Sequence, residues 1–219
     1  MTLQCLVTYR ELPIDRALSR MSLLSSFMCD DAVQSLLTLD KKAALEVIAR
    51  DDEVDRLYFF VVRQLKRASE DGTILRDLGL SSPRECLSYR MVAKALERAA
   101  DHGARIAQTT LNMNKPIDNF VRKQILNLKD SALTTFKKSI KLLLNKFDFE
   151  KANSLIEDLK SIKALEDKII KSMVNSSIDA ASLIELRMVV ESIRRMAEYG
   201  SDIAELAMNL NVNHHHLLL

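Results

Sequence analysis

Residues that interrupt regular secondary structure are scarce in this chain. Its 219 residues include only four Gly and three Pro. Because these two residue types mark most turns and helix ends, their scarcity predicts few, long elements. Trp is absent and aromatic residues make up 5% of the chain, so the core must be built mainly from Leu, Ile, Val, Met and Ala. Leu and Ala also favour helices, and the sequence therefore predicts an all-α fold.

Apolar residues recur with helical spacing along most of the chain. Residues 1–13 look extended, and six helices are expected at 14–39, 40–70, 83–113, 116–146, 149–174 and 179–210. Asp40 is the expected N-cap of the second helix, and Pro83 opens the third at a position where helices tolerate proline. Residues 71–83 are expected to form a loop. Residues 211–219 contain three adjacent His, and we expect a flexible or artificially added tail there rather than a metal site.

An internal repeat divides the chain into two halves. When the sequence is shifted by 97 residues, segment 89–92 falls on 186–189, and Gly103 falls on Gly200. Amphipathic spacing alone does not produce a shared register through Arg, Gly and small residues. We therefore expect two tandem three-helix bundles, residues 14–113 and 114–210. Short turns would make the six long helices antiparallel neighbours.

The charge balance argues against a nucleic-acid-binding protein. The chain has 32 basic and 30 acidic residues, a formal net charge of +2, so it lacks a strongly basic footprint. The best basic stripe lies on the fourth predicted helix, where a solvated helix face is the simpler interpretation. Its members are Lys137, Lys138, Lys141 and Lys146. We expect no binding of nucleic acid by this chain itself.

Other features place the chain in a reducing compartment. Cys5, Cys29 and Cys86 lie far apart and show no zinc-binding or CxxC spacing, as expected of reduced thiols. No apolar run is long enough to cross a bilayer, and the first residues do not resemble a signal peptide. We expect a cytoplasmic protein that does not insert into a membrane.

Four carboxylates form the candidate site. On a helical wheel, Asp51 and Asp55 fall one turn apart inside the apolar face of the second helix. Carboxylates buried there require a cation, either Arg, Lys or a metal. Glu97 and Asp101 have the same spacing on the flank of the apolar face of the third helix. Two such pairs on adjacent helices would supply four hard oxygen donors, which suit Mg²⁺, Mn²⁺ or iron.

Ion pairs offer a second interpretation of these carboxylates. Pairs of acids at this spacing are common on charged helices, and five basic residues lie close enough in sequence to neutralise them: Arg50, Arg56, Arg90, Lys94 and Arg98. Spacing alone favours ion pairs, whereas the position of the two aspartates on an apolar face favours a metal. His102 lies about 100° around the helix from Asp101, which argues against its inclusion.

The second half keeps only part of this pattern. Arg194 stands where Glu97 stands in the first half, whereas Glu198 matches Asp101. On the fifth helix Glu166 is followed one turn later by Ile170, which replaces the second carboxylate. We therefore expect one metal site, in the first repeat, with Arg194 able to neutralise the remaining acids.

The residues of the first half resemble the PhoU family. Glu97–His102 (Glu-Arg-Ala-Ala-Asp-His) is similar to its ERxxDH segment, and Asp51 and Asp55 stand at its other E(D)xxxD motif. The resemblance covers residues 14–210. It implies two three-helix bundles that carry iron or other metals, such as zinc, manganese or magnesium, on these motifs. It also implies a negative regulator of phosphate uptake that acts on a phosphate ABC transporter or a sensor kinase. We expect a homodimer.

A finer resemblance concerns three segments. Residues 2–7, 15–21 and 51–59 are similar to the PhoU portion of archaeal proteins that fuse an AbrB-like DNA-binding domain to a PhoU domain. Nothing in this chain resembles the AbrB-like domain, so a fragment or a shortened relative is expected.

Three functions compete on the sequence. The first is a metal-binding regulatory module that contacts a transporter, a kinase or a second copy of itself. The second is a di-metal enzyme, which would use Glu-x-x-His pairs that these helices lack. The third is a metal-free helical scaffold, or the effector domain of a transcription regulator without its DNA-binding part. Because no nucleophile arrangement or phosphate-binding Gly-rich loop occurs, we expect no enzyme and no catalytic residues.

Overall fold

A computed structural model describes residues 12–176 and 178–215, and within them the fold is all helical. Six long helices are present: α1 (Ile14–Thr38), α2 (Lys41–Glu70), α4 (Pro83–Asn112), α5 (Asn119–Leu144), α6 (Phe149–Val174) and α7 (Ala180–His215). A short helix, α3 (Gly72–Asp77), lies between α2 and α4. The predicted all-α fold of six long helices is confirmed.

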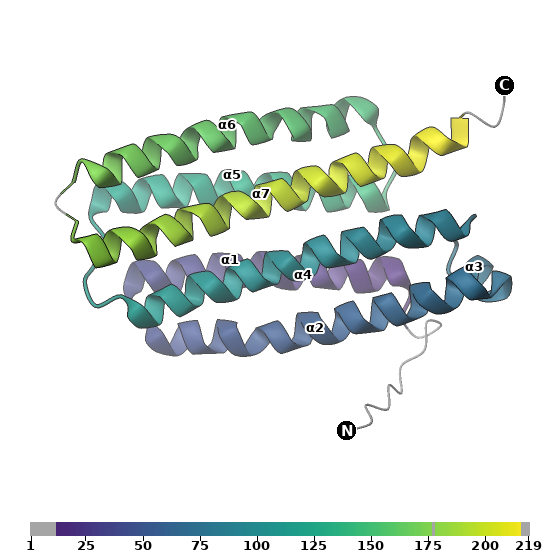
Figure 1. The fold of residues 1–219 in the computed structure, drawn as a ribbon, viewed down its shortest axis with the longest axis horizontal. Helices are drawn as coiled ribbons and strands as arrows, with labels where there is room; N and C mark the ends of the chain where they lie inside the picture. Colours follow the sequence, from purple (N-terminus) through teal and green to yellow (C-terminus); the bar gives the residue numbers. More distant parts are fainter. Residues whose placement is uncertain (1–11, 177, 216–219) are drawn as a thin grey trace.

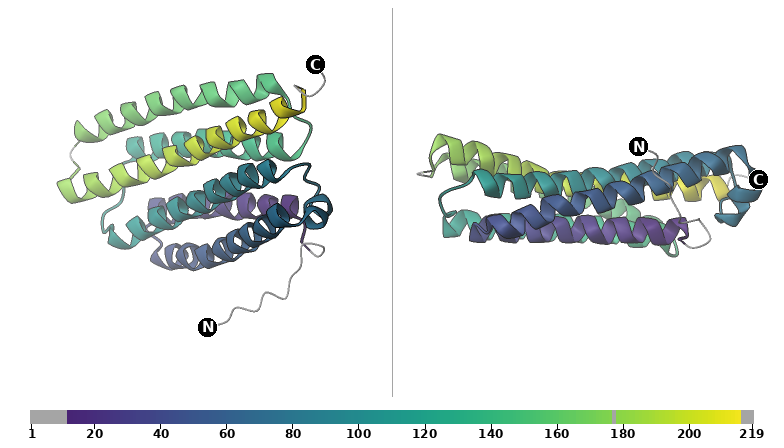
Figure 2. Two further views of the ribbon diagram at one scale, coloured as in Figure 1. Left: turned by 45° about the vertical axis from the view of Figure 1, so that its right-hand side comes forward. Right: turned by 90° about the horizontal axis from the view of Figure 1, so that it is seen from below.

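The helices form two triplets that lie side by side. Helices α1, α2 and α4 make the first, α5, α6 and α7 make the second, and α4 packs against α7 along the seam (Figure 1). Seen from below, α1 and α5 lie in one layer and α4 and α7 in the other (Figure 2). The predicted pair of three-helix bundles is therefore the observed architecture.

Aspartates define the beginnings of several helices. A carboxylate oxygen of Asp40 accepts a hydrogen bond of 3.0 Å from the backbone N–H of Ala43, which confirms its predicted role as N-cap of α2. Asp118 and Asp148 cap α5 and α6 in the same way. Helix α5 begins at Asn119 rather than at residue 116, because Asp118 supplies the cap that Pro116 lacks.

Two boundaries differ from the sequence predictions. The predicted loop at residues 71–83 contains α3, because the Asp71 side chain caps it through Thr73 and Leu75 is buried. The last helix continues to His215, five residues beyond the predicted end, so the predicted tail is partly helical. Residues 1–11 of the segment predicted to be extended, 1–13, lie outside the described residues.

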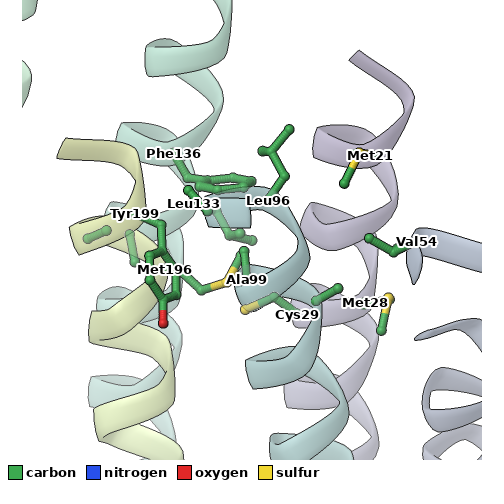
Figure 3. Close-up of a cluster of buried hydrophobic side chains, with 14 of the residues drawn as sticks. Met21, Met28, Cys29, Val54, Leu96, Ala99, Leu133, Phe136, Met196 and Tyr199 are labelled. Carbon is green, nitrogen blue, oxygen red and sulfur yellow. The ribbon is translucent and has the colours of Figure 1, made fainter. Parts of the chain in front are cut away.

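One hydrophobic core joins the two triplets. Leu96 on α4, Phe136 on α5 and Met196 on α7 are each fully buried and lie together in Figure 3. Two glycines let the helices approach closely at this depth. A Cβ added to Gly200 would lie 2.9 Å from the Cα of Phe136, and one added to Gly103 would lie 3.1 Å from the Cβ of Met28. These contacts hold α7 against α5 and α4 against α1.

Candidate metal centre

Helices α2 and α4 bring the four candidate carboxylates to one face of the first triplet. The two helices pack together, and the Lys94 ammonium of α4 lies 5.2 Å from the centre of the Tyr58 ring of α2. Among the like charges, Glu97 acts most strongly on Asp55 and Asp101 acts most strongly on Asp51, which is the pairing expected of antiparallel helices in this register. Asp51 and Asp55 are partly buried, as their place on the apolar face predicts, whereas Asp101 is exposed.

The carboxylates disfavour one another's ionisation. Burial, followed by the charges of Asp101 and Asp55, raises the pKa of Asp51 to about 6. The pKa of Asp55 is also raised, by burial first and then by Glu97 as the leading like charge. The pKa of Asp101 is raised in the same order although its side chain is exposed, because the packed helices around its carboxyl displace part of the water. Four negative groups therefore lie within electrostatic reach of one another, and a cation placed among them would relieve their repulsion.

Two of the five candidate basic partners are engaged elsewhere. Arg50 donates to Asp31 on α1 at 2.7 Å, and Arg56 donates to the backbone carbonyl of Asp52. Within residues 12–176 and 178–215, no Lys or Arg nitrogen lies within the 4.0 Å limit of an ion pair to Asp51, Asp55 or Asp101. The Oδ1 atom of Asp51 is buried and accepts no hydrogen bond from the described residues.

Glu97, the fourth candidate carboxylate, forms an ion pair with Lys94. The lysine ammonium lies 2.6 Å from Oε1 and 2.5 Å from Oε2 of Glu97, and only the contact to Oε1 has hydrogen-bond geometry. Within the described part of the chain, no three His, Cys, Asp or Glu side chains converge closely enough to hold a metal ion. The four carboxylates thus share one face without converging on a common point, so a metal would have to draw them together and displace Lys94 from Glu97.

His102 takes no part in this cluster. Its ring lies 5.8 Å from that of Tyr199 on α7, which agrees with the wheel argument against its inclusion. Burial, followed by the charges of Arg105 and Arg195, lowers the pKa of His102 to about 4. The imidazole is therefore neutral at physiological pH.

An arginine occupies the corresponding place in the second repeat. The Nε atom of Arg194 lies 2.6 Å from Oε2 of Glu166, and the guanidinium also contacts the carboxylate of Glu198. All three side chains are at most 15% exposed. The predicted role of Arg194 in neutralising the remaining acids agrees with these contacts.

The correspondence between α6 and α2 that the sequence predicts, with Glu166 matched to Asp51 and Ile170 to Asp55, is wrong by one helical turn. Glu166 contacts Arg194, which stands at the position of Glu97, and Glu97 is the carboxylate whose charge acts most strongly on Asp55. Glu166 is thus the counterpart of Asp55, and Ile162 replaces the other aspartate. The sequence alignment assigned this replacement to Ile170, because it lacked the contacts across the helix pair.

Three further cations of this cluster were missed in the sequence, one of which is Arg187, at 3.6 Å from Oε1 of Glu166. Arg195 donates to Oε2 of Glu198 at 2.5 Å, and the Lys163 ammonium lies 3.4 Å from Oε1. The spacing of three residues between Arg195 and Glu198 on one helix is the signal that could have revealed Arg195. The contacts of Lys163 and Arg187 join two helices and required the tertiary structure.

Comparisons with known proteins agree with this fold. The PhoU domain family model matches residues 18–110 and again residues 125–207. None of the curated proteins compared with the chain matches it significantly. No helix in the described residues is long and apolar enough to span a membrane.

Two solved structures share the fold. The phosphate transport system regulatory protein PhoU from Streptococcus pneumoniae has a TM-score of 0.77 and 18% identity, over 91% of this chain and 94% of that one. PhoU from Pseudomonas aeruginosa has a TM-score of 0.66 and 18% identity, over 91% of this chain and 96% of that one. Since the PhoU domain model matches both repeats, which together make up most of the sequence, the chain belongs to the PhoU family.

Proposed function

We propose that this protein is a regulator of phosphate uptake that binds a single metal centre on its first repeat. The observation that carries the proposal is the difference between the repeats. Asp51, Asp55 and Asp101 have no ion-pair partner within the described residues, whereas Glu166 and Glu198 are neutralised by Arg194. Three carboxylates of the first repeat therefore lack the pairing that Arg194 gives to the acids of the second repeat, and Lys94 neutralises only Glu97 in the first.

The chemistry of the donors favours a hard cation. Asp51 and Asp55 from α2 and Glu97 and Asp101 from α4 would provide carboxylate oxygens, which suit iron, manganese or magnesium, and zinc is also compatible. A bound ion would neutralise the charges that now raise the pKa of the aspartates. It would also link α2 to α4 on the surface, where it could alter what the face presents to a partner.

The partners follow from the family rather than from a contact. The S. pneumoniae structure is described as a phosphate transport system regulatory protein. By this relationship we propose that the chain acts on a phosphate transporter or a sensor kinase as a non-enzymatic cytoplasmic regulator, and that it forms a homodimer. The resemblance to the archaeal fusion branch stays a prediction.

A metal-free scaffold is the second candidate. The ion pair between Lys94 and Glu97 favours it, because this lysine already neutralises one of the four carboxylates. In that case α2 and α4 would serve only to present a helical surface to a partner.

Metal content separates the two candidates. Untagged protein is loaded with Fe²⁺, Mn²⁺ or Zn²⁺, freed of loosely bound metal and analysed for metal per chain. Stoichiometric metal is expected in the wild type and less than a tenth of it in Asp55→Asn/Asp101→Asn, because two of four donors lose their charge.

The matched control carries the same number of changes in the other repeat. Glu166→Gln/Glu198→Gln is expected to retain the metal of the wild type, although it loses its pairing with Arg194. Equal loss in both variants, or a wild type that takes up none of these ions, would contradict the metal site and leave the scaffold.

The regulatory role requires a cellular measurement. In cells that make this protein, deletion of its gene is expected to raise phosphate uptake when phosphate is plentiful. The wild-type gene should restore repression, and the Asp55→Asn/Asp101→Asn gene should not. Uptake that is unchanged by the deletion would refute the regulatory assignment independently of metal content.

A further inference from the structure

We propose that the end of the second repeat where α5 meets α6 binds a small phosphorylated organic anion. A cavity of about 470 Å³ opens there between the two helices. Its volume lies in the range of pockets that hold small organic ligands and is far larger than a single phosphate ion requires. This place is distant in sequence from the carboxylates of the first repeat, and the inference does not rest on the proposed metal site.

Four lysines from three segments line this cavity. Lys138 and Lys141 come from α5, Lys146 from the turn and Lys151 from α6. They face one lining carboxylate, that of Asp158. Ammonium groups that converge from several directions bind phosphate oxygens as point charges, whereas a solvated stripe on one helix would not surround a ligand.

Most of this positive charge is not neutralised by the protein. Lys151 is paired with Asp148, at 2.8 Å. Lys138, Lys141 and Lys146 have no carboxylate oxygen within ion-pair distance among the residues that the structure describes. The cavity therefore has the charge to attract an anion with more than one negative group.

The floor of the cavity is apolar. Leu142 and Leu155 line it and belong to a small hydrophobic cluster with Ala204 and Ala207 of α7. The Ser154 hydroxyl also lines the cavity, and it makes no hydrogen bond to any described residue. An apolar floor, a free hydroxyl and a basic rim together suit a ligand with a flat organic body and a phosphate tail, of about the size of a nucleotide.

The fold itself does not require lysines here. Gly200 packs against Phe136 of α5 as Gly103 packs against Met28 and Cys29 of α1, which aligns the two helices. In that alignment Asp31 and Gln34 of α1 stand where α5 has Lys138 and Lys141. The basic lining is thus a property of the second repeat alone.

Calorimetric titration with ATP in excess EDTA tests the proposal. EDTA removes metals, so that the nucleotide cannot be held through a metal on the first repeat. ATP is expected to bind with one-to-one stoichiometry, and adenosine and pyrophosphate each at least ten-fold more weakly, because each offers only part of the complementary chemistry. Equal affinity for pyrophosphate and ATP would contradict a role for the apolar floor.

A charge-matched pair of variants gives the decisive comparison. Lys138→Gln/Lys141→Gln is expected to weaken ATP binding at least ten-fold. Lys123→Gln/Lys168→Gln removes the same charge from exposed positions outside the cavity and should leave binding unchanged. Circular dichroism verifies that both variants are folded.

Three results would overturn the proposal. One is no ATP binding at millimolar concentration. Another is equal weakening in both variants, which would indicate only a dependence on net charge. The third is tighter binding of an RNA oligonucleotide than of ATP, lost in Lys138→Gln/Lys141→Gln, which would make this surface a nucleic-acid site.

Discussion

Asp51 shows how one residue can signal a site. A carboxylate on the apolar face of a helix is unfavourable unless a cation accompanies it. In this structure no cation of the described residues pairs with Asp51, and burial together with neighbouring carboxylates raises its pKa to about 6. The second repeat keeps the same face and supplies Arg194 instead.

Metal-free protein should therefore gain stability from Asp51→Asn at neutral pH. The folded pKa of Asp51 lies above its ordinary value of 3.8, so the folded state holds the proton more tightly than the unfolded state. The cost of ionising it is absent below pH 3.8 and is fully present above about pH 6. We expect the variant to be more stable by about 1–2 kcal/mol at pH 7, allowing for the partial exposure of the carboxyl.

Urea unfolding at pH 4, 5.5 and 7 in EDTA measures this difference. The gain should shrink as the pH falls, because the wild-type carboxyl becomes protonated in both states. A gain that is the same at all three pH values would show that packing, and not ionisation, causes it.

In the second repeat, Arg194 should stabilise the acids as a metal ion would in the first. Variants of Arg194 are made in an Asp55→Asn/Asp101→Asn background, so that the first repeat cannot bind added metal. In this background, Arg194→Met and Arg194→Glu should each cost about 2–4 kcal/mol of stability. The cost arises because Glu166 loses its closest partner inside the protein.

Only Arg194→Glu should respond to metal. This variant adds a third carboxylate between Glu166 and Glu198, so millimolar Mn²⁺ should restore part of its stability in thermal unfolding. If Mn²⁺ stabilises Arg194→Met equally, the ion acts elsewhere on the protein.

At the scale of elements, each triplet contains a close contact between two of its helices. Helix α7 crosses α5 at Gly200 and helix α4 crosses α1 at Gly103. These two glycines coincide in the internal repeat, and an added Cβ would be crowded at both, at 3.1 Å for Gly103 and at 2.9 Å for Gly200. Small residues let backbones approach at a crossing, so such residues set the distance between helices.

Gly200→Ala should lower the free energy of unfolding by about 1–3 kcal/mol, because the added Cβ would lie 2.9 Å from the backbone of Phe136 and the helices would have to separate. Gly72→Ala is the control, since a Cβ there meets only the end of the Arg76 side chain, at 3.7 Å. Guanidinium unfolding measures both, and equal effects would refute the argument from helix contact.

At the scale of the whole molecule, the two repeats are not independent. The core shown in Figure 3 takes residues from both, including Leu96 of α4 and Phe136 of α5. Because α4 also packs against α7, either triplet alone would expose apolar surface that is now buried.

The protein should consequently unfold in one cooperative step. Differential scanning calorimetry is expected to give a single transition whose calorimetric and van't Hoff enthalpies agree. Phe136→Ala should lower the midpoint of that one transition, at a cost of about 3–5 kcal/mol, and should not split it. Two separate transitions would show that the repeats fold independently.

The sequence by itself determined the elements and their repetition. Scarce Gly and Pro, helical periodicity and the register of Gly103 on Gly200 are local or repeated patterns, so six long helices in two triplets could be predicted. It also placed Asp51 and Asp55 on an apolar face, since helical geometry depends only on spacing.

Only the tertiary structure decided which charges meet. Distances between side chains on different helices depend on how the helices pack, and no spacing along one helix contains them. The contact of Lys163 with Glu198, the replacement of an aspartate by Ile162 rather than Ile170 and the cavity between α5 and α6 therefore emerged from the fold alone. The helix α3 was missed because Asp71 caps it and Leu75 packs it, two contacts that override the loop character of its sequence.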